Sequence, residues 1–278
     1  MSSLTIETKF HRIEGKEWGN PQGKVILAFH GWLDNANSFE PMASFFKDYR
    51  FISLDFPGHG KSSHKAENSF YYFNEYVLEV IAIAKGLGLN EFILLAHSMG
   101  AAVSTLVAST NLLNIEKLIL IEALGPLTNS AQSAPDILTE AIKQALHPKG
   151  KRETYFPDME SAIGVRMRAG GMKRTSAEIL MERGIEKTSK GLKPRRDLKL
   201  HLNSFYRYTE DQIVNFCERI EVPTLLILGD TSEYPIESNF ERRKKAIKNF
   251  RQTILPGGHH LHMDNPEVVA NTILEFIN

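Results

Sequence analysis

Short apolar runs alternate with longer helical patterns along this chain, and this alternation constrains the fold more than any other feature of the sequence. Apolar runs that are bounded by Gly, Pro or Asp and separated by helical segments are typical of a mostly parallel sheet. The expected helices cover residues 70–87, 99–109 and 266–277, and residues 5–18 predict an N-terminal strand or hairpin. The expected strands of the sheet are residues 25–29, 51–54, 92–95, 118–121, 225–228 and 252–255.

Residues 125–218 break this alternation. They contain no apolar strand-like run, several prolines, and helical patterns at 137–146 and 177–183. The simplest interpretation is a helical cap inserted between two consecutive strands, with residues 1–124 and 219–278 forming the α/β core. The basic groups of the cap, and the helical segment 242–245, are expected to be solvated surface. Those groups of the cap are Lys149, Lys151 and Arg152, and Arg195 with Arg196.

The charge balance and the apolar pattern argue against two classes of partner, nucleic acids and membranes. Lys+Arg and Asp+Glu both number 33, so the basic excess of a nucleic-acid-binding protein is missing. No apolar stretch is long enough to span a bilayer, and the N-terminus lacks a secretory pattern. The single cysteine, Cys217, suits a reducing compartment. We therefore expect a cytoplasmic protein that acts on a small molecule, with no nucleic-acid or membrane partner.

Each apolar run is followed by polar or reactive residues. In open α/β sheets, ligands bind at the carboxyl ends of the strands. Six such endings would form a single polar rim, which is the strongest sequence argument for a catalytic site. In chain order, the endings are His30-Gly31-Trp32, Asp55, His97-Ser98, Glu122, Asp230 and His259.

Ser98 is the predicted nucleophile. It lies in Ala96-His97-Ser98-Met99-Gly100, between an apolar strand and an Ala-rich helix, which is the setting of a nucleophile elbow. Small residues flank the serine because the turn is sharp. The first of them is Ala rather than Gly, which relaxes the G-x-S-x-G pattern but keeps its physical requirement. The alternative is that Ser98 only caps the helix.

A serine nucleophile requires a base and donors for the oxyanion. His259 follows the last strand and a Gly-Gly turn, so we predict it as the base, with His260 and His262 as competitors. The backbone N–H groups of Trp32 and Met99 are the predicted oxyanion donors. Trp32 lies in the loop after the first long strand, and Met99 follows the nucleophile.

The acid that orients the base is ambiguous at this level. Glu122 ends the strand after the nucleophile's strand, Asp230 ends the next one, and Glu233 lies slightly further on. Each of these carboxylates could accept the imidazole N–H. A carboxylate at the end of a buried strand is costly unless it is paired, so neither Glu122 nor Asp230 is expected to be idle. The residues alone leave these two alternatives open.

Together, these motifs resemble the α/β-hydrolase superfamily, and more narrowly the serine hydrolase-like proteins. The resemblance implies an α/β-hydrolase fold with a mostly parallel eight-stranded sheet flanked by helices, a helical cap insertion, and a cofactor-free ester hydrolase. In relatives of this kind an acid stands at the position of Glu122. In this chain, Ser232 stands where the usual Gly-x-x-Asp pattern has its Asp. Both points of the resemblance favour Glu122 over Asp230. The motifs are His30-Gly-Trp-Leu-Asp-Asn-Ala-Asn-Ser-Phe39, Asp55-Phe-Pro-Gly-His-Gly-Lys-Ser62, His97-Ser-Met-Gly100, Leu118-Ile-Leu-Ile-Glu-Ala-Leu-Gly-Pro126, Glu182-Arg-Gly184, Arg195-Arg-Asp197 and Gly257-Gly-His-His-Leu-His262.

The main prediction is a two-step acyl transfer on a small carboxylic ester, with thioesters, lactones and carbon–carbon bonds as further substrate classes. A non-catalytic ligand-binding protein is the alternative, because the fold does not determine the function. His260-Leu-His262-Met-Asp264 also resembles a binuclear metal motif, but Asn265 replaces its final His, so we predict no metal site there. The absence of G-x-G-x-x-G between a strand and a helix disfavours a dinucleotide enzyme.

Overall fold

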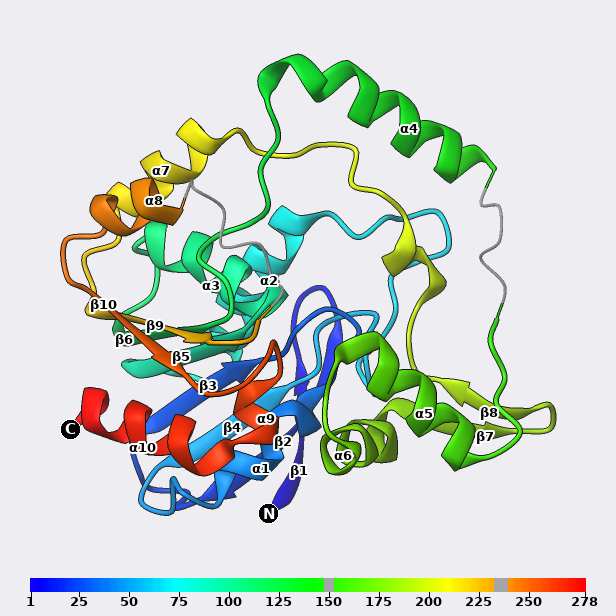
Figure 1. The fold of residues 1–278 in the computed structure, drawn as a ribbon, viewed down its shortest axis with the longest axis horizontal. Helices are drawn as coiled ribbons and strands as arrows, with labels where there is room; N and C mark the ends of the chain where they lie inside the picture. Colours follow the sequence, from blue (N-terminus) through cyan, green and yellow to red (C-terminus); the bar gives the residue numbers. More distant parts are fainter. Residues whose placement is uncertain (148–152, 233–239) are drawn as a thin grey trace.

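The computed structural model describes residues 1–147, 153–232 and 240–278, and within them the main sheet has the strand order β1-β2-β4-β3-β5-β6-β9-β10 (Figure 1). The β1–β2 and β2–β4 pairs are antiparallel and the other pairs are parallel. This sheet confirms the predicted fold class. Its strands are β1 (Ser2–Glu7), β2 (Arg12–Gly19), β3 (Val25–Phe29), β4 (Arg50–Leu54), β5 (Phe92–His97), β6 (Ile115–Ile121), β9 (Thr224–Gly229) and β10 (Phe250–Leu255).

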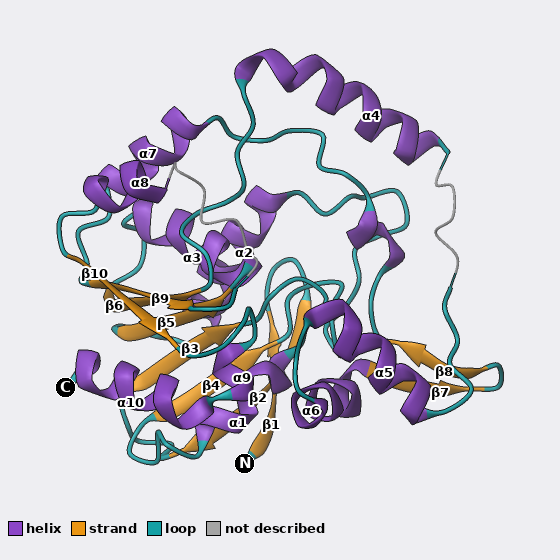
Figure 2. Ribbon diagram, viewed as in Figure 1, coloured by secondary structure: helices purple, strands orange, loops and turns teal. Residues whose placement is uncertain are grey.

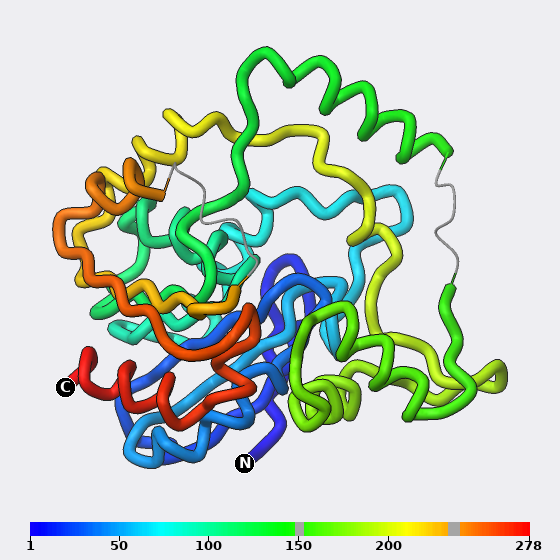
Figure 3. Tube along the Cα trace, viewed as in Figure 1, coloured from blue at the N-terminus to red at the C-terminus, as the bar shows by residue number. Residues whose placement is uncertain are grey.

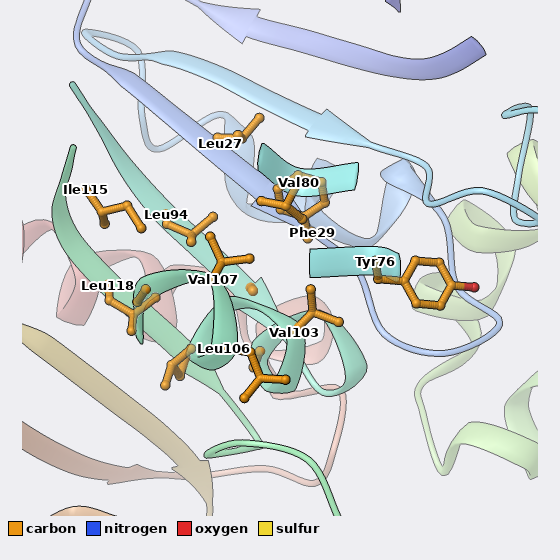
Figure 4. Close-up of a cluster of buried hydrophobic side chains, with 14 of the residues drawn as sticks. Leu27, Phe29, Tyr76, Val80, Leu94, Val103, Leu106, Val107, Ile115 and Leu118 are labelled. Atoms are coloured by element: carbon orange, nitrogen blue, oxygen red, sulfur yellow. The ribbon is translucent and has the colours of Figure 1, made fainter. Parts of the chain in front are cut away.

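Helices cover both faces of the sheet (Figure 2). Alternate residues of β3 face opposite sides, because successive side chains of a strand point in opposite directions. Leu27 and Phe29 join the hydrophobic cluster beneath α2 and α3 (Figure 4), whereas Ile26 and Ala28 join the cluster beneath α1, α9 and α10. The core helices are η1 (Ala36–Phe39), α1 (Glu40–Ala43), α2 (Phe73–Gly86), α3 (Met99–Ser109), α8 (Phe240–Ala246), α9 (Leu261–Asp264) and α10 (Pro266–Ile277).

The predicted elements are found with small shifts at their ends. Residues 25–29, 99–109 and 266–277 match β3, α3 and α10 at both ends, and the other predicted strands extend by one to three residues. Helix α2 begins later than predicted, at Phe73. Tyr72 has an extended backbone, and its N–H donates to the Glu75 carboxylate at 3.1 Å, which satisfies a helix-terminal donor. The predicted segment 5–18 lies within the β1–β2 hairpin, which starts three residues earlier and ends one residue later.

Between β6 and β9 the chain leaves the sheet and returns to it (Figure 3). Helices α5 and α6 pack together, and α7 packs against α3 and α8 through Ile213 and Cys217 of the main core. The hairpin β7–β8 lacks any apolar run that could have predicted it. The division into core and cap stays a prediction. The elements of this insertion are η2 (Ala131–Ser133), α4 (Ala134–Leu146), α5 (Met159–Gly170), α6 (Arg174–Gly184), β7 (Ile185–Thr188), β8 (Gly191–Pro194), η3 (Leu198–His201) and α7 (Glu210–Glu218).

The prediction that segment 242–245 is solvated was wrong for Arg243, which is 1% exposed. Its guanidinium donates to the Leu124 carbonyl at 2.6 Å and forms a bidentate pair with Glu210 at the start of α7. The arginine therefore joins α8 to α7 and to the end of β6, a long-range arrangement that a charge pattern cannot reveal. Arg195 and Arg196 are also partly buried. Lys149, Lys151 and Arg152 lie outside the described residues.

The parallel strands end at the same edge of the sheet. Phe29 pairs with Leu54 of β4 and with Ala96 of β5, and Ile121 pairs with His97 of β5 and with Ile227 of β9. The residues that follow these strands are therefore brought together, as predicted. Within the described residues, no helix combines the length and the apolar character needed to cross a membrane.

Candidate active site

Ser98 occupies a strained turn between β5 and α3. Its φ is 50° and its ψ is −115°, a conformation that non-glycine residues rarely adopt. A Cβ on Gly100 would lie 2.4 Å from the carbonyl oxygen of Phe29, so the helix can approach β3 only if this position is glycine. Ala96 fits at the other flank, where it is fully buried. The turn therefore demands a glycine on one side of the serine and tolerates a methyl group on the other.

A chain of hydrogen bonds joins Ser98, His259 and Glu122. The Ser98 hydroxyl lies 2.9 Å from His259 Nε2, and His259 Nδ1 lies 3.0 Å from Glu122 Oε2. His259 follows β10 and Glu122 follows β6, the strand next to β5, so all three side chains come from the ends of parallel strands on one half of the sheet. A carboxylate that accepts the Nδ1–H leaves Nε2 unprotonated and able to accept the serine proton.

Glu122 is 1% exposed, and its backbone has a φ of 64°. The backbone N–H of Gly229 donates to its Oε1 at 2.6 Å, and the Ser232 hydroxyl donates to its Oε2. Burial raises the pKa of this carboxyl group, but the hydrogen bonds from His259, Ser232 and Gly229 outweigh it, so the pKa lies below its ordinary value. The group is therefore ionised at neutral pH beside His259.

Asp230 lies near this chain of hydrogen bonds but has another partner. Its Oδ1 accepts the backbone N–H of Gly257 at 2.9 Å, which holds the turn that precedes His259. The structure therefore places Glu122, and not Asp230, against the imidazole. Glu233 lies outside the described residues.

The two competing histidines have other partners. His260 Nδ1 lies 3.0 Å from the Gly170 carbonyl, and His262 Nε2 lies 2.8 Å from the Ser38 hydroxyl. Asp264, the acid of the metal-like motif, accepts hydrogen bonds from Ser176 and from the N–H of Lys173. The three side chains of that motif therefore do not converge on one point.

The two predicted oxyanion donors line the same cavity as Ser98. Met99 is the first residue of α3, where a backbone N–H has no partner within the helix. Trp32 lies in the loop after β3, and its indole N–H donates to the Leu200 carbonyl at 3.2 Å. His30 holds this loop, since its Nε2 accepts the N–H of Phe56 at 3.0 Å. The roles of Trp32 and Met99 stay predictions.

The cavity has a volume of about 830 Å³ and lies between the strand edge and the insertion. Core residues such as Ser98, Met99 and His259 form one side, and Ala169 and Tyr206 of the insertion contribute to the other. About half of its other lining side chains are aromatic or apolar, which favours a ligand with a large apolar part.

Comparisons with known proteins identify the family of this chain. The family model for the alpha/beta hydrolase fold matches residues 24–159. A serine hydrolase-like protein of Dictyostelium discoideum is 31% identical, over 95% of this chain and 78% of the relative. This chain belongs to the serine hydrolase-like group of the α/β-hydrolase superfamily.

Two solved structures extend this placement among the α/β hydrolases. The crystal structure of a hypothetical protein from Pseudomonas aeruginosa PAO1 has a TM-score of 0.92 and 37% identity, over 100% of this chain and 98% of that one. A thioesterase domain from the curacin biosynthetic pathway has a TM-score of 0.85 and 26% identity, over 99% of both chains.

This serine hydrolase-like protein also has a buried polar cluster beside the serine that sequence reasoning missed. It consists of Asp34, His97, His260 and Arg166. His97 Nε2 donates to the His259 carbonyl at 2.8 Å, and burial lowers the pKa of His97 to about 4, so this ring is neutral at pH 7. Burial raises the pKa of Asp34, but the charge of the Arg166 guanidinium beside it acts in the opposite direction, and the pKa of this carboxyl group lies well below its ordinary value. The only sequence signal was the position of His97 and His260 next to Ser98 and His259.

Proposed function

We propose that this protein hydrolyses small carboxylic esters, or related acyl compounds, through an acyl-enzyme on Ser98. The observation that carries the proposal is the chain of hydrogen bonds from the Ser98 hydroxyl through His259 to the buried Glu122. A protein that only binds a ligand has no need of a strained serine beside a base that is itself paired with a carboxylate.

The geometry supports a two-step reaction. His259 takes the Ser98 proton as the serine oxygen attacks the substrate carbonyl, and Glu122 stabilises the imidazolium that forms. The N–H groups of Trp32 and Met99 hold the oxyanion, and losing one such donor costs about 3–4 kcal/mol of transition-state stabilisation. His259 then protonates the leaving group, and a water activated by the same histidine releases the acid and restores the Ser98 hydroxyl.

The cavity supports an acyl group that is largely apolar. Tyr72, Phe73, Leu127, Tyr206 and Tyr208 all line it, and these side chains favour hydrocarbon over charged substituents. Thioesters are the second candidate class, because the similar curacin domain is a thioesterase domain. An acyl-enzyme on serine serves both classes, since only the leaving group differs.

The first test is covalent labelling with a fluorophosphonate, followed by mass spectrometry of the peptides. We expect one adduct on Ser98 and none in the Ser98→Ala variant. A panel of p-nitrophenyl esters and acyl thioesters of increasing chain length then ranks the two substrate classes. If the unmodified protein is not labelled, the serine is not activated and the ligand-binding alternative takes first place.

A further inference from the structure

Three acceptor atoms converge beside the predicted catalytic residues. They are Oδ2 of Asp34, Nδ1 of His97 and Nε2 of His260, and all three lie within 4.8 Å of one another. Asp34 Oδ2 is 3.7 Å from the His97 nitrogen and 3.5 Å from the His260 nitrogen. The three residues are 3%, 0% and 6% exposed, so their polar atoms are largely removed from bulk water.

The opposite nitrogen of each ring sets the direction of its lone pair. His97 Nε2 lies 2.8 Å from the His259 carbonyl, and His260 Nδ1 lies 3.0 Å from the Gly170 carbonyl. A carbonyl oxygen only accepts hydrogen bonds, so these nitrogens carry the protons of the neutral rings. The unprotonated nitrogens therefore face Asp34. A histidine that donates its other N–H to a backbone carbonyl is the usual arrangement of a metal ligand.

Arg166 satisfies this cluster only in part. Its Nη2 pairs with Oδ1 of Asp34 and lies 3.2 Å from Nε2 of His260. Within the described part of the chain, Asp34 Oδ2, His97 Nδ1 and Nε of Arg166 itself have no hydrogen-bond partner. Leaving a buried polar atom without a partner costs about 1–3 kcal/mol, and more for a charged group. A further cation between the Asp34 carboxylate and the two imidazoles would give these acceptor atoms a partner.

We propose that Asp34, His97 and His260 bind a divalent transition-metal ion such as Zn²⁺. Two ligands of a tetrahedral zinc ion lie about 3.4 Å apart, given bonds of about 2.1 Å, and the two distances from Asp34 Oδ2 are close to this value. Imidazole and carboxylate donors favour Zn²⁺ or Cu²⁺ over Mg²⁺, which prefers oxygen ligands. A water fills the fourth position.

The cavity supplies the route for the ion. The three ligands and Arg166 all line it, so the ion reaches Asp34 from the same space that the substrate enters. The guanidinium of Arg166 and the metal compete for Nε2 of His260, which lies 3.2 Å from Nη2 of Arg166. The two cations also repel each other beside the Asp34 carboxylate. Binding therefore displaces the guanidinium of Arg166 from Asp34 into the cavity, and this competition limits the affinity for the metal.

The test is a calorimetric titration with ZnCl₂ of the protein of residues 1–278, freed of metal with EDTA. We expect one Zn²⁺ per chain and no binding of Mg²⁺. His260→Gln and Asp34→Asn should each weaken Zn²⁺ binding at least tenfold, whereas His64→Gln, which alters an exposed histidine, should bind as the parent does. Melting curves without metal verify that each variant is folded.

Arg166→Met provides a test in the opposite direction. Removing the competing guanidinium should tighten Zn²⁺ binding at least tenfold and enlarge the rise in Tm that Zn²⁺ produces. A merely structural arginine would not give a gain in affinity. This variant keeps the proposal testable even if a ligand variant does not fold.

His259→Gln separates this site from direct metal binding by the predicted base. Retention of Zn²⁺ in His259→Gln, with its loss in His260→Gln, supports the Asp34 site. The reverse result would place the ion on His259 and overturn the proposal, and so would the absence of any Zn²⁺ binding to the parent protein.

Discussion

The strand edge and the insertion position their polar side chains in different ways. At the edge, Ser98, Glu122 and His259 each follow the end of a strand or the turn after it, so the backbone of the sheet brings them together. The insertion instead meets the edge through side-chain contacts, among them the ion pairs of Arg166 in α5 and Arg183 in α6 with aspartates of the core.

Arg183 illustrates this second way. It forms a bidentate pair with Asp55 at 2.7 and 3.0 Å, and both side chains are almost fully buried. Asp55 also accepts the backbone N–H groups of Ala36 and Lys61, at 2.7 Å each. The sheet therefore positions the proposed reacting groups, whereas buried ion pairs position the wall that faces them.

The largest effect is expected from Ser98→Ala, which removes the nucleophile at the strand edge. Without it, no acyl-enzyme forms, so kcat should fall by about 10⁴–10⁶-fold, while the melting temperature stays close to that of the parent. Steady-state hydrolysis of a p-nitrophenyl ester measures the loss. Near-parental activity in this variant would mean that Ser98 is not the nucleophile.

Glu122→Gln should have the next largest effect, because it replaces the carboxylate that orients His259. A comparable change in a known triad lowers kcat by about 10⁴-fold. Asp230→Asn is the matched control, since Asp230 accepts the N–H of Gly257 and not that of His259, and we expect a loss of less than about tenfold. If Asp230→Asn lowers kcat more than Glu122→Gln does, the assignment of Glu122 as the acid is wrong, whereas the fold is unaffected.

Arg183→Met tests how strongly the insertion is joined to the core. It leaves Asp55 buried without its cation, and breaking a buried pair in this way costs about 3–5 kcal/mol of the free energy of unfolding. Arg174→Met is the control on the same helix. Its partners Glu160 and Glu178 are exposed, so a change within about 1 kcal/mol is expected. Urea denaturation measures both, and equal losses would contradict the comparison.

The smallest expected effect is on the pH dependence of stability, and it comes from His59 in the loop after β4. Burial lowers the pKa of His59 to about 3, so between pH 6.5 and 3 the unfolded chain binds a proton that the folded protein does not. This histidine therefore makes stability fall as the pH drops through that range. In His59→Phe the decrease in the free energy of unfolding between pH 7 and pH 4 should be smaller than in the parent by up to about 3 kcal/mol.

The measurement for this prediction is urea denaturation at both pH values. Replacing the exposed His64 by Gln should leave the fall unchanged. His30, His97 and His262 also have pKa values lowered by burial, so a residual fall is expected in both variants. An equal decrease in the free energy of unfolding in His59→Phe and in the parent would mean that His59 does not cause the pH dependence.

The sequence predicted the strand edge well because each relevant residue follows a local signal, an apolar run that ends. These local signals could not decide between Glu122 and Asp230, since both follow neighbouring strands, and only the family resemblance favoured Glu122. The difference lies in tertiary contacts: the N–H of Gly229 and the hydroxyl of Ser232 reach Glu122, whereas the N–H of Gly257 occupies Asp230.

The insertion was predicted less well, because its contacts are distant in sequence. Arg183 lies 128 residues from Asp55, and Arg166 lies 132 residues from Asp34. Neither arginine belongs to a periodic pattern that indicates burial. Arg243 was misjudged for the same reason, since its partner Glu210 belongs to another helix. Local charge patterns predict exposure, and only the packed structure reveals which charges meet.

The position of Trp32 gives this protein a built-in optical reporter. The chain has two tryptophans, and Trp32 is 49% exposed in the wall of the cavity, with its ring beside His201. The other, Trp18, packs edge-on against Phe51. In a Trp18→Phe variant, indole emission would arise from the cavity alone. The entry of a substrate analogue could then be followed by fluorescence in real time, without a label and before any bond is broken.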